Sequence, residues 1–95
     1  MAAVKIDLSG GLEGLFGNQK EFVLQLDQQM TLKQLVHHFK DKHLQARPEL
    51  FLSGDNVRPG ILVLVNETDW ELCGKENYVI QDRDSISFIS TLHGG

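Results

Sequence analysis

Four histidines are the side chains in this sequence that could bind a metal ion, because imidazole is the commonest protein ligand of transition metals. They are His37, His38, His43 and His93. His37 and His38 are adjacent on a predicted helix and point about 100° apart, so they cannot bind one ion from the same face. His43 lies four residues after Phe39, at the end of the apolar face of that helix. The chain has one cysteine and no Cys/His set at ligand spacing, so the sequence predicts no metal site.

Nucleophilic catalysis would use Cys73 or a serine, with a histidine, an orienting carboxylate and a sizeable pocket beside it. A domain of 95 residues with one predicted helix seldom contains such a cavity. Cys73 follows Leu72 in a stretch that starts at Trp70, so we interpret it as a small packing residue or an inert surface thiol. The sequence therefore predicts that the chain is not an enzyme.

Carboxylate pairs and a glycine-rich segment are the remaining candidates for chemistry. Asp69/Glu71 and Asp82/Asp84 resemble paired carboxylates, but turn formation and strand solubility explain them better. The glycine-rich residues 10–17 lack the Lys-Ser/Thr of a phosphate-binding loop, and the pattern predicts that they do not open a helix. We find no catalytic constellation.

The last four residues, Leu92-His93-Gly94-Gly95, are not explained by packing. Glycine makes up about 7% of residues in proteins, so two glycines end a chain by chance about 0.5% of the time. The pair directly follows a predicted strand, which divides the chain into a domain over residues 1–90 and a flexible tail over residues 91–95 that can extend on the order of 16 Å. A tail without side chains can thread a narrow channel and place its terminal carboxylate in another protein's active site. A frayed terminus or a cloning remnant is the alternative.

Charge and hydropathy exclude two classes of partner. Nine Lys plus Arg against 13 Asp plus Glu give a net charge of −4, and the arginines are scattered, so we expect no direct nucleic-acid contact. The longest apolar run, residues 61–65, is too short for a membrane span, and the first residues lack a signal-peptide pattern. The lone cysteine weakly favours a reducing compartment. We expect a cytoplasmic monomer with no membrane contact.

Alternation of apolar and polar residues predicts strands with one buried face at residues 4–9 and 21–26, which can pair as an antiparallel hairpin. Residues 61–65 have no polar member, which fits either a strand covered on both sides or one whose outer face meets a partner. In the last predicted strand, residues 85–91, Ile89 lies on the face opposite to Ile86 and Phe88.

A 3.6-residue period follows Thr31 and predicts one helix of about 13 residues. Thr31 and Gln34 have the spacing of a capping box, and Pro48 ends the helix no later than Arg47. The apolar face consists of Leu32, Leu35, Val36 and Phe39. Residues 66–84 show no such period, so only short strand or turn pieces are expected there. The order of elements favours an α+β, β-grasp (ubiquitin-like) fold, a mixed sheet wrapped around one main helix. A ferredoxin-like fold would need a second covering helix.

Several stretches closely resemble the ubiquitin-related modifier 1 family. The resemblance covers essentially the whole chain and is densest over residues 47–95. Its motifs are Arg47-Pro-Glu-Leu-Phe51, Ser53-Gly-Asp-Asn-Val-Arg-Pro-Gly60, Ile61-Leu-Val-Leu-Val-Asn66, Asp69-Trp-Glu-Leu72 and Ser85-Ile-Ser-Phe-Ile-Ser-Thr-Leu-His-Gly-Gly95. The N-terminal half matches more loosely, through Gly10-Gly-Leu-Glu13 and Leu15-Phe16.

This resemblance implies a sulfur carrier that is also a protein modifier. In the family, a ubiquitin-activating-type adenylyltransferase and sulfurtransferase uses ATP and persulfide sulfur to convert the terminal carboxylate, that of Gly95 here, into a thiocarboxylate. A cytosolic tRNA thiolase complex then uses the sulfur to 2-thiolate the wobble uridine of certain tRNAs. The same terminus can be joined to lysines of target proteins. The ATP site belongs to the enzyme, so no cofactor is expected on this chain.

The resemblance also suggests a role for Ile89, which we expect to form an apolar docking patch with a neighbour such as Leu92. Burial of Ile89 against a loop is the alternative. Two other functions stay open at this point. The chain could be the small subunit of a molybdopterin-synthase-like complex, or a passive ubiquitin-like interaction module.

Overall fold

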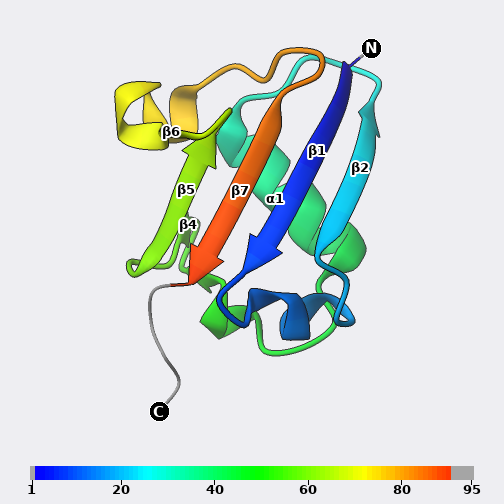
Figure 1. Cartoon of the computed structure of the whole chain (residues 1–95), viewed down its shortest axis with the longest axis vertical. Coiled ribbons are helices and arrows are strands. Elements are labelled where there is room, and N and C mark those ends of the chain that lie inside the picture. The colour runs from blue at the N-terminus through cyan, green and yellow to red at the C-terminus, as the bar shows by residue number, and fades with distance from the viewer. Residues whose placement is uncertain (1, 91–95) are drawn as a thin grey trace.

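The computed structural model describes residues 2–90, which form a mixed β-sheet with one α-helix packed across a single face (Figure 1). The sheet has five strands in the order β2-β1-β7-β5-β6. The main elements are β1 (Ala2–Ser9), β2 (Glu21–Leu26), α1 (Leu32–His43), β5 (Ile61–Val65), β6 (Thr68–Asp69) and β7 (Ser85–Ser90). The central strands β1 and β7 are parallel, and the other neighbours are antiparallel. This is the β-grasp arrangement, so the predicted fold is confirmed.

Helix α1 begins and ends where the sequence indicates. The Thr31 hydroxyl accepts a hydrogen bond from the Gln34 backbone N–H at 3.3 Å, and the Gln34 side chain accepts one from the Thr31 N–H at 2.9 Å. This reciprocal pair is the predicted capping box. The helix spans 12 residues and ends at His43, ahead of Pro48.

Short helices and strands occur where the apolar residues follow neither a helical nor a strand period. The 3-10 helix η1 (Leu12–Phe16) follows Gly11, so the expectation that the glycine-rich segment opens no helix is wrong. Burial of Leu12, Leu15 and Phe16 stabilises this single turn, which is too short to produce a periodic signal. A hairpin of β3 (Leu52–Ser53) and β4 (Asn56–Val57) was also not predicted.

The remaining short elements lie on either side of β5 in the sequence. The 3-10 helix η2 (Pro48–Leu50) precedes β3, and η3 (Trp70–Leu72) and η4 (Lys75–Asn77) follow β6. The stretch between β5 and β7 therefore contains only short pieces, as predicted. Within residues 2–90, no helix has the length and apolar content needed to cross a bilayer.

The core between α1 and the sheet is built around phenylalanine rings. Phe39 of α1 is fully buried, stacks on Phe16 with ring centroids 4.6 Å apart, and meets the edge of Phe22 at 5.0 Å. Phe51 extends the cluster to Phe88 of β7, with centroids 5.5 Å apart. The helix, the sheet and the two connecting segments that contain Phe16 and Phe51 therefore pack in one cluster, which fixes β7 relative to its neighbours.

Candidate functional site

The residues predicted to carry the chemistry, Leu92, His93, Gly94 and Gly95, lie outside the described residues. Strand β7 ends at Ser90, and the predicted division into a domain and a tail stays a prediction. What the structure describes is therefore the platform from which these residues leave the domain. That platform is the C-terminal end of strand β7, which is flanked by β1 on one side and by β5 on the other (Figure 1).

The loop after β1 lies against the last residue of β7. A Cβ atom placed on Gly10 would be 2.3 Å from the Ser90 carbonyl oxygen and 2.9 Å from the Ser90 nitrogen. Gly10 also has φ +72°, in the left-handed region that disfavours other residues. Only glycine fits here without moving the end of β7. Sequence reasoning missed this role because residues 10 and 90 become neighbours only through the parallel pairing of β1 with β7.

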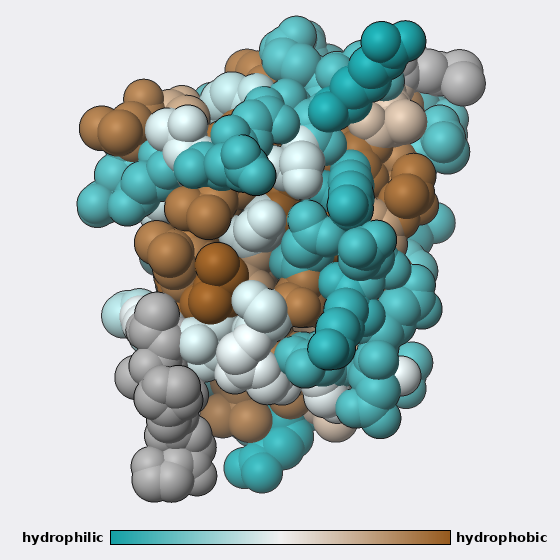
Figure 2. Space-filling model, viewed as in Figure 1, coloured by the Kyte–Doolittle hydropathy of each residue, from teal (hydrophilic) through white to brown (hydrophobic). Residues whose placement is uncertain are grey.

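An apolar patch lies on the face of the sheet that is not covered by α1. Ile89 pairs in register with Leu62 of β5, and Leu64 lies two residues along the same face. Leu62 is 37% exposed, while Leu64 and Ile89 are half-buried. Figure 2 shows this apolar group over β5 and β7, with polar side chains over β1 and β2 beside it. We call these three residues the outer-face patch.

The geometry of the outer-face patch rules out one of two sequence interpretations of residues 61–65, and a partner on the outer face stays a prediction. The strand is not covered on both sides, because Leu62 is exposed on the outer face while Val63 is fully buried beneath. Ile89 lies on the face opposite to Ile86 and Phe88, which are fully buried. A docking role for Ile89 stays a prediction, and its suggested neighbour Leu92 is not among the described residues.

Two histidines of α1, His37 and His43, contact other parts of the fold. The His37 Nε2 atom lies 2.9 Å from the Asp55 carbonyl oxygen. The His43 ring packs between Phe22 and Phe39, with centroid distances of 4.7 and 5.5 Å. Burial lowers the pKa of His43, and the nearby charges of Lys42 and His38 add to that effect. Among the residues that the structure describes, no three His, Cys, Asp or Glu side chains converge on a metal position.

Turn formation, as predicted, explains Asp69, but Asp82 binds the start of β1 and Asp84 is buried, so strand solubility does not explain the second pair. Asp69 accepts the Glu71 backbone N–H at 3.0 Å and caps η3, and Asp82 accepts the Ala3 N–H at 2.8 Å. Asp84 is buried, and it accepts hydrogen bonds from the Tyr78 hydroxyl (2.6 Å), the Asn66 amide (2.9 Å) and the Gln81 N–H (2.8 Å). Burial and the bond to Asp84 raise the pKa of Tyr78 to about 12.

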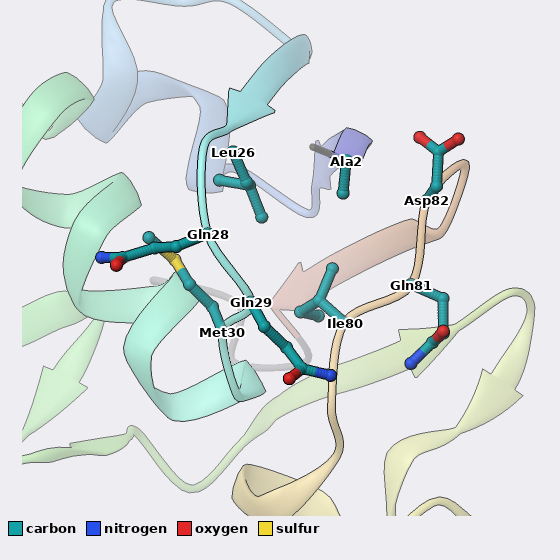
Figure 3. Close-up of a pocket in the computed structure, with 8 residues that line it drawn as sticks. All are labelled: Ala2, Leu26, Gln28, Gln29, Met30, Ile80, Gln81 and Asp82. Carbon is teal, nitrogen blue, oxygen red and sulfur yellow. The ribbon is translucent and has the colours of Figure 1, made fainter.

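Cys73 is half-buried and packs against the edge of the core, whereas its neighbour Leu72 is 81% exposed. This agrees with a packing role for the thiol. A small cavity of about 190 Å³ lies near the start of β1 and the end of β2, at the opposite end of the sheet from Ser90 (Figure 3). Its polar wall consists mostly of glutamine amides, and the side chains of Gln28 and Gln81 point away from one another. Asp82 is the one carboxylate of the described lining, and no histidine, cysteine or serine lies beside it there, so these residues do not pair a nucleophile with a base.

The sequence as a whole matches one family of known proteins. A family model described as Urm1 (Ubiquitin related modifier) matches residues 3–95. The chain belongs to this ubiquitin-related modifier family. The ubiquitin-related modifier 1 homolog of Chlamydomonas reinhardtii is 54% identical over 99 residues, covering 100% of both chains. Ubiquitin-related modifier 1 of Mus musculus is 50% identical, covering 97% of this chain and 94% of the mouse protein.

A solved structure of the same family has the same fold. The solution structure of Urm1 from Trypanosoma brucei superimposes with a TM-score of 0.84 at 39% identity, covering 98% of this chain and 95% of that one. The ubiquitin-related modifier family consists of small ubiquitin-like modifiers and sulfur carriers that are not themselves enzymes. Ubiquitin-like modifiers typically work with activating enzymes.

Proposed function

We propose that this chain carries sulfur as a thiocarboxylate on Gly95, that the sulfur is used to 2-thiolate the wobble uridine of cytosolic tRNAs, and that the same terminus is joined to lysines of target proteins. The observation that carries this proposal is the family match, which runs through the end of β7 to Gly95. The location that fits these reactions is the cytoplasm.

Activation has to come first, because a carboxylate is too poor an electrophile for attack by sulfur. An oxygen of the Gly95 carboxylate attacks the α-phosphorus of ATP on the activating enzyme, pyrophosphate leaves, and an acyl adenylate forms. The terminal sulfur of an enzyme persulfide then attacks the acyl carbon and AMP leaves. A thiol cleaves the resulting S–S bond, which releases the thiocarboxylate and leaves a disulfide on the enzyme. ATP and persulfide sulfur are therefore reagents of the partner.

The fold supports this proposal by what it presents near the reacting end. Ser90 ends a central strand whose neighbours on both sides are fixed by sheet pairing, so the segment that follows starts from a rigid position. The outer-face patch lies beside this exit and offers apolar surface for the activating enzyme to bury. His93 and Leu92 connect Ser90 to the glycines, and Gly94 leaves room for a narrow channel around the terminus.

Intact-mass spectrometry tests the proposed chemistry. Incubation with ATP, the cognate activating enzyme and a sulfur donor is expected to raise the mass by about 16 Da, the difference between sulfur and oxygen, all of it on Gly95. Deletion of Gly95 should abolish the change. An unchanged wild-type mass, under conditions in which a control carrier reacts, would refute the carrier function.

A substitution at Gly94 tests the need for a side-chain-free segment. We expect Gly94→Val to leave the thermal midpoint nearly unchanged, because the buried core lies between Val4 and Phe88, and to impair thiocarboxylate formation strongly. Gly14→Val is a matched control, since a Cβ at Gly14 meets only the Asn18 side chain at 3.9 Å. Equal activation of both variants would show that Gly94 does not enter a narrow site.

The two uses of the activated terminus are tested in cells. Loss of the chain should remove 2-thiouridine from cytosolic tRNAs, and the wild-type chain, but not the chain without Gly95, should restore it. Lysine conjugates should disappear with the same deletion. Stable co-purification with one large synthase subunit, in place of these effects, would indicate a synthase subunit instead.

A further inference from the structure

A second cavity opens directly beside the exit of β7. Its volume is about 420 Å³, and Ser90 is one of its lining residues. The walls are mostly apolar: Leu12 and Leu15 of η1 are buried, whereas Leu50 of η2 is 38% exposed. Gly11 contributes backbone only, with no heavy atom within 4 Å of where its Cβ would be, so this side of the cavity is open. We call this cavity the exit pocket.

Arg58 supplies the one charged group that lines the exit pocket among the residues described. Its Nη1 atom donates a hydrogen bond to the Glu49 carbonyl oxygen at 2.9 Å, which holds the guanidinium in place. The other two arginines each lie within 4.0 Å of a carboxylate, Arg47 of Glu49 and Arg83 of Asp82. Within residues 2–90, Arg58 has no such partner, although the chain carries a net charge of −4.

The Arg58 guanidinium, which has no carboxylate partner among the described residues, indicates the chemistry of the occupant. An arginine has five N–H donors in a planar fork that matches a carboxylate, and one bond to a carbonyl leaves most of that fork unused. The apolar walls match an aliphatic or aromatic side chain. The exit pocket therefore fits an apolar side chain with a carboxylate next to it, which is a feature of a protein surface.

We propose that the exit pocket is a recognition site for the activating enzyme, which inserts an apolar side chain between Leu50 and η1 and pairs an adjacent Asp or Glu with Arg58. This inference rests on the proposed function, in which Gly95 reacts in that enzyme's active site. Residues 91–95 can span on the order of 16 Å. An enzyme that holds Gly95 therefore has surface within that distance of Ser90, and Ser90 lines the pocket.

The exit pocket has a different task from the outer-face patch. The outer-face patch is apolar and has no charged member, so it adds buried area without fixing a direction. A carboxylate held by the fork of Arg58 fixes orientation as well as distance. Docking at the exit pocket would set the angle at which the terminal segment enters the channel of the enzyme.

Steady-state activation measured against carrier concentration tests this inference. We expect Arg58→Gln and Leu50→Ser each to raise the half-saturating carrier concentration about tenfold, the effect of losing one charge-assisted or well-packed contact, with kcat within about twofold of wild type. Leu50→Met, which keeps an apolar side chain, should stay within about twofold in both parameters.

Matched controls carry the same chemical changes at the opposite end of the molecule (Figure 1). Arg83→Gln removes the same charge from a side chain that is 92% exposed, and Leu72→Ser removes an apolar side chain that is 81% exposed. Both should saturate at the wild-type concentration. If Arg58→Gln and Leu50→Ser do so as well, the exit pocket does not contact the enzyme. If the wild-type chain is not activated at all, the proposed function fails, and this inference fails with it.

A photo-crosslinking residue at position 50 identifies the occupant directly. The expected product joins this chain to the activating enzyme, and the same residue at position 72 should give none. A product that joins two copies of this chain would overturn the assignment to the enzyme and indicate self-association at the exit pocket.

Discussion

Replacing Gly10 by alanine is the sharpest test of how β7 is held at its end. The methyl carbon would lie 2.3 Å from the Ser90 carbonyl oxygen and 2.9 Å from the Ser90 nitrogen. Both distances are well inside van der Waals contact, and both Ser90 atoms belong to the backbone. Alanine at φ +72° adds about 1–2 kcal/mol of left-handed strain. Moving one backbone segment to relieve the overlap adds roughly 1–3 kcal/mol. The free energy of unfolding should therefore fall by about 2–5 kcal/mol, of the 5–15 kcal/mol typical of a domain.

Thermal and denaturant unfolding measure this effect. At about 4–8 °C per kcal/mol for a domain of this size, the midpoint should fall by roughly 8–40 °C. Gly54→Ala is the matched control, because Gly54 has φ +64° but nothing within 4 Å of its Cβ position. It should lose only the strain, about 1–2 kcal/mol. If the two variants lose the same amount, the close approach of Gly10 to Ser90 does not exist in solution and the argument for a clamped exit is refuted.

Three further predictions concern ionisation and the outer-face patch. Burial and the hydrogen bond to Asp84 raise the pKa of Tyr78 to about 12, so the folded state keeps a proton that the unfolded state loses above pH 10. The free energy of unfolding should therefore fall from pH 10 to 12 more steeply in the wild type than in Tyr78→Phe, as measured by urea unfolding at each pH. Burial lowers the pKa of His43 below 6.5, so its contribution to stability is lost as pH falls; between about pH 7 and pH 5 the wild type should lose more unfolding free energy than His43→Gln, and parallel curves would contradict this. Ile89→Ser should weaken binding of the activating enzyme in a calorimetric titration by about tenfold, whereas Val23→Ser, which removes an apolar side chain that is 67% exposed near the other edge of the same face, should not.

Local signals in the sequence were sufficient for the main elements. The alternation over residues 21–26 predicted β2 to the residue, and the capping box at Thr31 and Gln34 located the start of α1. Both depend on contacts within a few residues. The hairpin of β3 and β4 and the 3-10 helix η1 were missed, since two-residue strands and single turns are stabilised by burial of Leu52 and Phe16 rather than by a repeated pattern.

The candidate functional surface could also be predicted from the sequence only in part. The alternation of side chains along a strand predicted that Ile89 lies on the face opposite to Phe88. That Leu62 lies next to Ile89 follows only from the register of β5 against β7. Three of the lining residues of the exit pocket, Gly11, Leu50 and Arg58, come from separate segments, and Leu50 belongs to η2. No spacing in the sequence links them, because their proximity follows from how the loops close over one end of the sheet.

The sequence by itself determined the β-grasp class, the single capped helix, the family and the terminal glycines, because periodicity, capping and motif order are properties of neighbouring residues. Only the tertiary structure decided that Gly10 packs on Ser90, that Arg58, with no carboxylate partner within residues 2–90, lines a mostly apolar cavity, and that the buried Asp84 accepts a hydrogen bond from Tyr78. Gly10 and Ser90 are far apart in the chain and meet through the parallel β1–β7 pair, and the Asn66 amide that also binds Asp84 lies 18 residues before it. Such contacts have no local signature, since their free energy is realised only when the whole sheet has formed.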